Sequence, residues 1–427
     1  DVKKLPAAHK LIIGHKKIRI EPYWHLTYEP KHQTSEVALK AELRELLSEA
    51  VRIRLISDVP LGAHLSGGID SSIVVALMAE ASDRPVKTFS VGFEETAFSE
   101  LPHARTVADL YSTEHREFKL TYGEIPQTLE KLITHFGEPF ADPSAIPLYY
   151  LSQLTREYVT VALNGDGGDE AFAGYQRYWL DPWATRYSLL PGWITTGLIP
   201  RMTRWLPDKS DRPAGGSLIN GLKRLEQITK IDPRASILRW GSYFSPEMKQ
   251  TLWREPRIDQ AESYLVGTFD HAPANNFMDQ TLSTDIHSYL PGDLLVKADR
   301  MTMASSLEGR SPFLDHKFAE WAARLPSKMK VRGFSGKYLL RKTFKDALPP
   351  SIYKRGKQGF GIPLGTWFRG PLASWAEDIL LGDSTPMGSW FRPSTLHRLL
   401  DEHITGKENH GKRIYTLVML SLWSQLY

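Results

Sequence analysis

The residues with the clearest capacity for chemistry lie in the loop Leu65–Ser72, which reads Leu-Ser-Gly-Gly-Ile-Asp-Ser-Ser. Gly67 and Gly68 allow the backbone to approach a phosphate, and the helix start after them offers unpaired N–H groups and a positive dipole end. Three hydroxyl donors accompany them: Ser66, Ser71 and Ser72. Asp70, at the helix start, could hold a metal ion. The loop therefore predicts a phosphate site, and the alternative is an ordinary strand–helix connection.

A second chemical signal is the segment Asn164–Glu170, which holds three glycines and three acids directly after an apolar run. Like charges at this spacing repel each other, so the segment makes a poor turn unless its charge is neutralised. A magnesium ion together with a cationic side chain would neutralise it. The segment therefore predicts an acidic metal site, and the alternative is a solvated turn.

Charged residues gather in two further places. Asp293 and Lys297 are spaced as a favourable i,i+4 ion pair on one short helical segment, for which a surface ion-pair ladder is the alternative. The loop Tyr353–Pro363 is rich in glycine and basic residues, which would suit the phosphates of a nucleotide. Its cations are Lys354, Arg355 and Lys357. A solvated basic loop is the alternative here.

These groups need a scaffold that brings them together, and the first half of the chain predicts one. Strands are expected at residues 61–65, 86–93, 115–120 and 158–163. Helices are expected at residues 35–55, 73–78, 100–111, 123–135 and 148–157. This alternation predicts an α/β fold with a doubly wound parallel sheet. Ligands of such sheets bind beyond the carboxyl ends of the strands, so residues 65–72, 91–93 and 164–170 should meet in one site.

The alternation stops near residue 175, which suggests the following organisation. Residues 1–34 are expected to be a linker segment with a small hairpin at 10–20, and residues 35–427 one large domain. The domain would contain an α/β core at 35–175, an aromatic helical insertion at 176–220 and a mainly helical part at 221–427 that completes the site. Helices are expected there at residues 222–228, 245–253, 260–269 and 337–348, with a closing pair at 396–427. A membrane- or partner-docking surface is the alternative for the insertion.

The amino-acid composition excludes several kinds of site and several classes of protein. The 427 residues include no cysteine, which excludes disulfides, cysteine metal sites and a cysteine nucleophile among them. A hydrophobic share of 41% and a charged share of 24% are those of an ordinary soluble protein. The net charge of +4 needs no nucleic-acid partner, since nucleotide phosphates would suffice. No apolar run approaches the roughly 18 residues of a membrane span and no secretory signal is visible, so a cytoplasmic protein is expected.

The loop at 65–72 resembles the pyrophosphate loop of the ATP pyrophosphatase superfamily, whose members transfer AMP from ATP and release pyrophosphate. Taken with residues 88–92, 163–175, 297–315 and 354–360, in this order, the chain is similar to the synthetase domain of the glutamine-dependent asparagine synthetases over nearly its whole length. Residues 5–26 resemble the junction after the family's glutaminase domain. The resemblance implies an adenine nucleotide alpha hydrolase-like fold, with ATP and Mg²⁺ as cofactors. It also implies a glutaminase domain or subunit as the ammonia source, and it leaves a homodimer open.

The same resemblance assigns roles to individual residues. Those that would bind the nucleotide are Leu65, Ser66, Gly67, Gly68, Asp70, Ser71, Ser72, Val91, Asn164 and Gly165. Asp70 and Asp169 would hold Mg²⁺ against the pyrophosphate. Asp166 stands where the asparagine synthetases have glutamate, and Asp293 lies near the family acid that recognises the acceptor's amino group. Lys357 matches the family lysine that touches the α-phosphate.

The reaction implied is activation of the aspartate side-chain carboxylate as an acyl-adenylate, followed by attack of ammonia to give asparagine. Two departures, Asn164 for serine and Asp166 for glutamate, keep open a related ligase that acts on another carboxylate. A sugar acid, a β-lactam precursor and a peptide side chain are the candidates. A tRNA-modifying pyrophosphatase is the alternative of a different class, but such enzymes usually need cysteines and an RNA-binding module, and neither is visible.

Overall fold

The computed structural model describes residues 2–15, 17–179, 242–255, 260–354, 361–382 and 385–427. Several predictions lie outside these residues. They are the aromatic helical insertion beyond residue 179, the helix at 222–228, and the part of the basic loop that contains Lys357.

Within the described residues, five strands form one parallel sheet in the order β5-β4-β3-β6-β7. They are β3 (Leu61–His64), β4 (Lys87–Phe93), β5 (Glu114–Leu120), β6 (Val161–Leu163) and β7 (Glu308–Arg310). The predicted parallel α/β sheet is therefore confirmed. Strand β7 was missed because Glu-Gly-Arg shows no apolar pattern, and its place depends on pairing with β6, where Val161 lies opposite Glu308.

The strand order places the predicted loops together. The chain runs from β3 outward through β4 to β5 and then returns to the other side of β3 as β6. The direction of winding thus reverses between β3 and β6, and ligands of open α/β sheets bind at such a reversal. The loop after β3 contains Asp70, and the loop after β6 contains Asp166 and Asp169.

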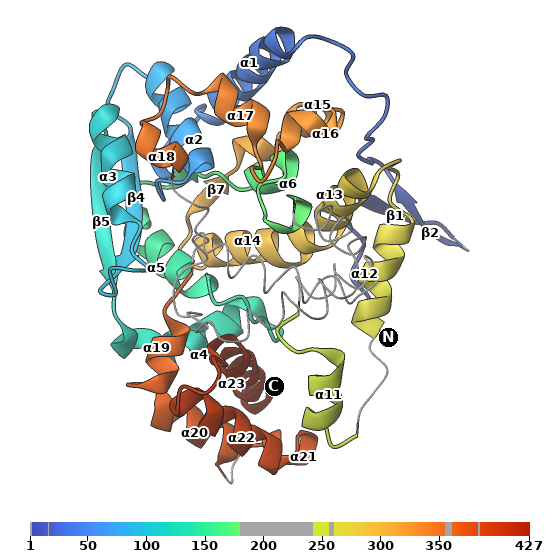
Figure 1. The fold of residues 1–427 in the computed structure, drawn as a ribbon, viewed down its shortest axis with the longest axis vertical. Coiled ribbons are helices and arrows are strands. Elements are labelled where there is room, and N and C mark those ends of the chain that lie inside the picture. Colours follow the sequence, from blue (N-terminus) through green and yellow to red (C-terminus); the bar gives the residue numbers. More distant parts are fainter. Residues whose placement is uncertain (1, 16, 180–241, 256–259, 355–360, 383–384) are drawn as a thin grey trace, which may run out of the picture.

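Helices cover both faces of the sheet, as a parallel sheet requires (Figure 1). One face carries α1 (Glu36–Arg54), α2 (Ile69–Glu80) and α3 (Leu101–Leu110), and the other carries α4 (Ile125–Phe136) and α5 (Ala145–Arg156). Alternate strand residues serve the two cores: Val161 and Leu163 join the first, and Ala162 joins the second. Helix α2 begins at Ile69, earlier than its apolar run predicted, because Asp70 and the serines after it form its first turn.

Outside the sheet and its covering helices, the described residues are mainly helical, as predicted. The elements of this part before the last strand are α6 (Gly168–Phe172), α11 (Pro246–Leu252), α12 (Gln260–Asp270), α13 (Phe277–His287), the π-helical turn η3 (Leu290–Leu294) and α14 (Leu295–Met303). After β7 come α15 (His316–Ala323), α16 (Ser327–Lys330), α17 (Tyr338–Thr343), α18 (Pro350–Lys354), α19 (Leu364–Arg369), α20 (Ala373–Leu381), α21 (Met387–Trp390), α22 (Pro393–Ile404) and α23 (Gly411–Leu426). The helix predicted at 337–348 is shorter, because Lys337 has a left-handed backbone (φ 57°) and stands before α17.

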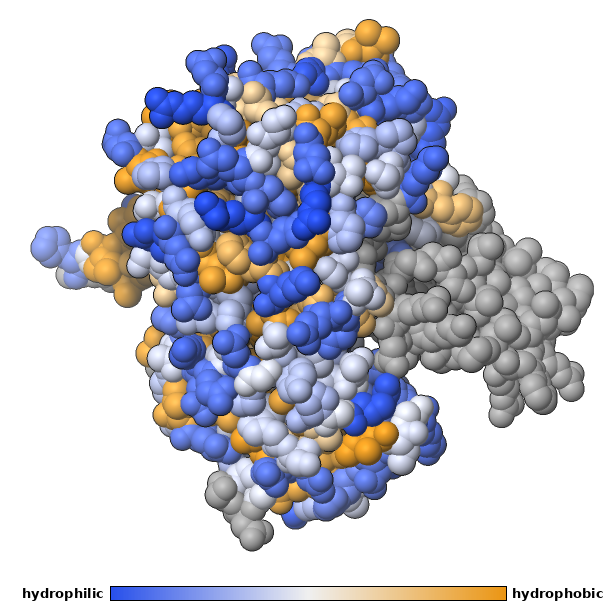
Figure 2. All heavy atoms as spheres, turned by 90° about the vertical axis from the view of Figure 1, so that its left-hand side faces the viewer, coloured by the Kyte–Doolittle hydropathy of each residue, from blue (hydrophilic) through white to orange (hydrophobic). Residues whose placement is uncertain are grey.

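The predicted N-terminal hairpin is also present, as β1 (His9–Ile13) paired antiparallel with β2 (Ile18–Pro22). It lies at the right of Figure 1, far from strands β4 and β5 at the left. The side of the molecule that carries β5 shows mostly hydrophilic side chains with scattered apolar ones between them (Figure 2). Among the described helices, none has both the length and the apolar character needed to cross a membrane.

Candidate active site

A large cleft of about 1280 Å³ lies at the carboxyl ends of β3, β4 and β6. It collects most of the predicted site residues on its wall: Leu65, Ser66, Gly68, Asp70, Ser71, Val91, Asn164, Gly165, Asp166, Asp169 and Asp293. Gly67 and Ser72 are not on this wall. Lys357 lies outside the described residues. The structure thus brings together groups from three strand ends and from the η3 segment.

The glycine loop is shaped by close packing and by its own serines. Gly67 has a left-handed backbone (φ +69°), and a Cβ atom there would lie 2.5 Å from the Ala104 backbone nitrogen of α3. Only glycine therefore fits. The hydroxyls of Ser66 and Ser71 lie 3.0 Å apart, and the Gly68 N–H donates to Ser66 Oγ over 3.2 Å. These contacts hold the N-terminus of α2 at the cleft, which is the arrangement that binds phosphate.

Glycines in the loop after β6 allow the two acidic loops to approach each other. A Cβ atom on Gly165 would lie 2.8 Å from the Ser71 backbone nitrogen, and one on Gly168 would lie 2.7 Å from Asp70 Cγ. Both positions exclude a larger residue. As a result, Asp70 and Asp169 face one point, although they come from different strands.

Lys337 lies at that point, and its role was missed in the sequence. Its Nζ donates to Asp70 Oδ2 and lies 2.7 Å from Asp169 Oδ1, and its side chain is only 8% exposed. Burial lowers the pKa of Lys337, but the two carboxylates outweigh burial and raise it above the ordinary value, so the amine stays charged. The acidic segment predicted a neutralising cation, and Lys337 provides one. The sequence signal for this close approach was the glycine before Lys337. A Cβ atom on Gly336 would lie 2.0 Å from the Ala173 carbonyl oxygen.

The donor set fits a magnesium ion. Asp70 and Asp169 present carboxylate oxygens, which are the ligands that Mg²⁺ prefers. Because Lys337 contacts both carboxylates, it would have to share them with the ion or move toward a phosphate.

A second charged cluster lies further along the cleft. Lys297 Nζ lies 2.6 Å from Asp142 Oδ2 and 2.8 Å from Ser144 Oγ. Asp142 Oδ1 also accepts hydrogen bonds from the Ser144 N–H (2.9 Å) and hydroxyl (2.8 Å). The predicted pairing of Lys297 with Asp293 is therefore wrong. Asp293 lies in the π-helical turn η3, which changes the spacing of residues along the helix, so it does not stack over Lys297 as i,i+4 residues of an α-helix do.

Asp293 and Asp166 are two partly buried acids of the cleft, and the pKa of each is raised. Burial, followed by the charge of Asp142, raises the pKa of Asp293 to about 7, while Lys297 opposes the shift. Its Oδ1 is buried and has no hydrogen-bond partner. Burial also raises the pKa of Asp166, and Lys297 again opposes it. Acids whose pKa values are raised in a cleft are candidates for proton transfer or for binding an amine.

We expect Asp293→Asn to stabilise the protein most at high pH. The folded-state pKa is raised, so the folded protein binds the proton more tightly than the unfolded chain does. The stability of the wild type therefore falls as pH rises from about 4, the ordinary carboxyl pKa, to about 7. The difference in melting temperature between variant and wild type should grow over this range and then level off. A difference that is constant from pH 4 to pH 8 would contradict this environment for Asp293.

Asn164, where the resemblance expects serine, forms side-chain hydrogen bonds with other residues of the protein. Its Oδ1 accepts hydrogen bonds from Ser311 Oγ (2.6 Å) and from the Asp166 N–H (3.2 Å). The side chain therefore links the loop after β6 to the segment after β7. The backbone of Asn164 remains at the cleft wall.

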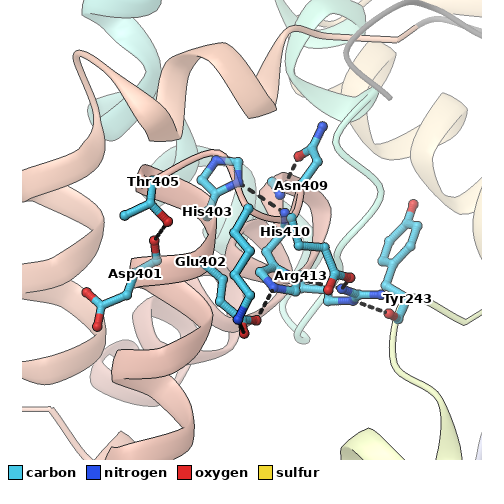
Figure 3. Close-up of polar contacts among 11 residues, drawn as sticks. Tyr243, Asp401, Glu402, His403, Thr405, Asn409, His410 and Arg413 are labelled. Carbon is cyan, nitrogen blue, oxygen red and sulfur yellow. Dashed lines mark hydrogen bonds and ion pairs between the residues drawn. The ribbon is translucent and has the colours of Figure 1, made fainter. Parts of the chain in front are cut away.

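The far end of the cleft rests on a polar network between α22 and α23 (Figure 3). Arg413 Nε donates to the Tyr243 carbonyl (2.9 Å), and the His410 N–H donates to His403 Nδ1 (3.0 Å). Tyr243 in turn lines the cleft. Ligand atoms of Glu402, Glu408 and His410 come within 4.8 Å of one another, as in some metal sites.

Positively charged side chains already pair with the carboxylates of this network. Lys407 Nζ lies 2.9 Å from Glu402 Oε1, and Arg413 Nη1 lies 2.8 Å from Glu408 Oε1. In addition, His410 faces Glu402 with Nε2 and Glu408 with Nδ1, the opposite nitrogen of its ring. One ion could not be bound by both ring nitrogens, so we interpret the network as structural.

Comparisons with known proteins agree with this architecture. The profile of the family described as asparagine synthase matches residues 42–425. The chain is 31% identical over 418 residues to the glutamine-hydrolyzing asparagine synthetase 1 of Bacillus subtilis, covering 96% of this chain and 62% of the relative. It is 26% identical over 421 residues to an amidase of Penicillium rubens, covering 85% of this chain and 60% of the relative. The chain thus spans about three fifths of the length of these curated relatives. Since the family profile covers most of it, the chain belongs to the asparagine synthase family.

Proposed function

We propose that the chain is an ATP-dependent amide-forming ligase that activates the side-chain carboxylate of aspartate and transfers ammonia to it. The observation that carries this proposal is the meeting of Asp70, Asp169 and Lys337 at the end of the glycine loop. That meeting point lies in the same cleft as two partly buried acids, Asp166 and Asp293. One end of the cleft suits a metal-bound triphosphate, and the other suits an acceptor with an amino group.

The chemistry requires activation because a carboxylate would have to expel oxide to accept ammonia. A carboxylate oxygen instead attacks the α-phosphorus of ATP, and the bond to the pyrophosphate breaks. Ammonia then attacks the acyl carbon, and AMP leaves with the former carboxylate oxygen. No covalent enzyme intermediate is needed, which is compatible with a chain without cysteine. Bound Mg²⁺ would neutralise charge on the leaving pyrophosphate.

Each part of the cleft has a role in this scheme. The backbone at Leu65, Val91 and Gly165 would contact adenosine, and the N-terminus of α2 would hold phosphate oxygens. Lys337 and Lys357 would stabilise the charge that builds on the phosphates in the transition state. These two lysines come from separate segments of the chain.

These two acids would act on the acceptor and on the ammonia. Asp166, whose pKa burial raises, would take the proton that the attacking nitrogen loses. Asp293 would bind the amino group of the acceptor through its unpartnered Oδ1. Ammonia would come from a glutaminase domain or subunit, since the Bacillus relative is named as glutamine-hydrolyzing and these residues include no cysteine. Because ATP and aspartate are cytoplasmic metabolites, we also propose a cytoplasmic location.

The test is AMP formation by the purified chain with ATP, Mg²⁺ and aspartate. We expect turnover with ammonium chloride and none with glutamine, because a thioester cannot form without cysteine. Turnover supported by glutamine alone would overturn the proposal that a glutaminase domain or subunit supplies the ammonia.

The matched variant for this test is Lys357→Ala, measured in a single turnover at saturating ATP. We expect the rate of AMP formation to fall far more than the affinity for ATP, because the lysine acts on transition-state charge. Lys345→Ala, at an exposed position just after α17, is the control and should keep the wild-type rate.

A further inference from the structure

The part of the cleft beyond the acids is lined by aromatic side chains. Four of them, Tyr175, Trp179, Tyr289 and Phe334, form what we call the aromatic wall. The rings of Tyr175 and Tyr289 meet edge to face with centroids 6.1 Å apart, and those of Trp179 and Phe334 do so at 5.8 Å. Such edge-to-face pairs are favourable arrangements of aromatic rings. The wall therefore consists of two aromatic pairs in a cleft whose lining also includes charged side chains such as Lys297 and Lys337.

A buried arginine holds part of the wall in place from behind. The Arg177 guanidinium lies 4.6 Å from the centre of the Tyr175 ring and 4.9 Å from that of Tyr289. Its Nη2 lies 2.8 Å from Asp285 Oδ2, and its side chain is only 11% exposed. The Tyr175 hydroxyl also donates to Glu170 Oε1 over 2.6 Å. Because these contacts fix both rings before any ligand binds, the wall is preorganised as a binding surface.

The wall lies next to the reacting groups. Tyr289 immediately precedes η3, the turn that carries Asp293. Burial raises the pKa of Tyr289, and the charges of Asp293 and Asp142 raise it further, as expected for neighbours in one cleft. A molecule whose amino group lies at Asp293 would therefore reach the aromatic wall with the rest of its body.

Free aspartate matches this surface poorly. Beyond its reacting carboxylate it has only an amino group and a second carboxylate, and none of the four side chains in the wall carries a positive charge. An apolar or planar group would instead gain by covering the rings, since small-molecule sites use aromatic surfaces in this way. Phe334 is 60% exposed at the cleft, so the wall also leaves room for a body that extends outward.

We propose that the acceptor is an aspartyl compound larger than the free amino acid, whose apolar or planar body packs against the aromatic wall while its side-chain carboxylate is activated beside the α-phosphate. This inference rests on the proposed ligase function and defines its substrate class. It predicts that affinity for the acceptor depends on the wall and that affinity for ATP does not.

The experiment compares three acceptors that carry the same side-chain carboxylate and amino group: aspartate, its α-methylamide and its α-benzylamide. The methylamide controls for loss of the second charge, and the benzylamide adds a ring. AMP formation is measured with ATP, Mg²⁺ and ammonium chloride. We expect kcat/KM for the benzylamide to exceed that for the methylamide by about tenfold or more, the scale on which apolar pockets discriminate. The difference should lie in KM.

Variants assign the preference to the wall. Trp179→Ala and Phe334→Ala should each reduce the ratio of benzylamide to methylamide toward one and leave the KM for ATP unchanged. Tyr264→Ala, at a position 60% exposed and not on the cleft wall, should retain the wild-type ratio.

The possible failures are distinguishable. If aspartate is the best acceptor and the two wall variants leave kcat/KM unchanged, the ligase function stands and the inference about the acceptor is overturned. A benzylamide no better than the methylamide overturns it as well. If none of the three acceptors yields AMP, the proposed function itself fails, and this inference fails with it.

Discussion

Replacing Asp70 with asparagine should lower the kcat/KM of amide formation by about two to three orders of magnitude, the range seen when one transition-state contact is lost. Asp70 is one of two carboxylates at the end of the glycine loop, and it faces the cleft from the first turn of α2. Asparagine keeps the shape of the side chain and can still accept a hydrogen bond from Lys337. It removes the negative charge that a Mg²⁺ ligand supplies. Activity should therefore be lost without loss of the fold.

The measurement is pyrophosphate release over a range of Mg²⁺ concentrations, with melting temperature as the check on folding. We expect the Mg²⁺ concentration for half-maximal activity to rise and the melting temperature to stay close to that of the wild type. Asp109→Asn, on the exposed side of α3, is the matched control and should behave as the wild type. Wild-type pyrophosphate release by Asp70→Asn would remove Asp70 from the metal site.

Lys337→Met should both weaken the protein in the absence of Mg²⁺ and lower its activity at least about a hundredfold. The methionine fills a similar volume but leaves Asp70 and Asp169 facing each other without a cation. Removing one partner from a buried ion pair destabilises proteins by about 3–5 kcal/mol, and partial exposure of these carboxylates, 15% and 18%, should reduce that figure. Added Mg²⁺ should then restore part of the loss, because a dication can neutralise both acids.

Thermal unfolding with and without Mg²⁺ tests this expectation. The rise in melting temperature on adding Mg²⁺ should be larger for Lys337→Met than for the wild type, because only the variant lacks a cation between the carboxylates. Lys345→Met, at an exposed position just after α17, controls for the loss of one positive charge. Equal Mg²⁺-induced shifts in the variant and the wild type would show that Lys337 does not neutralise this pair.

Local patterns in the sequence were sufficient to predict the parallel sheet and its loops. Strand β4 is predicted by its phenylalanine and valine residues, and α1 begins after its predicted cap, Ser35. The convergence of Asp70, Asp166 and Asp169 could also be predicted, because the carboxyl ends of parallel strands lie along one edge of a sheet. No contact between distant residues had to be known for that step.

Contacts between residues distant in the chain decided the ion pairs of the cleft and the last strand of the sheet. Lys337 and Asp70 are 267 positions apart, and Lys297 and Asp142 are 155 apart, so no local spacing marks either pair. The one ion pair predicted from spacing, Asp293 with Lys297, was wrong because the turn η3 is π-helical rather than α-helical. Strand β7 was missed for a related reason, since three residues without apolar character become a strand only by pairing with β6.

The sequence by itself therefore determined four of the five strands of the sheet, the positions of its phosphate and acid loops and the family, all of which depend on residues close together in the chain. Only the tertiary structure decided which cation neutralises the acids, which carboxylate pairs with Lys297, and that an aromatic wall held by Arg177 borders the reacting groups. The physical reason is that charge neutralisation and burial are satisfied by whichever groups the packed core brings together. Those partners come from segments that have no common pattern in the chain.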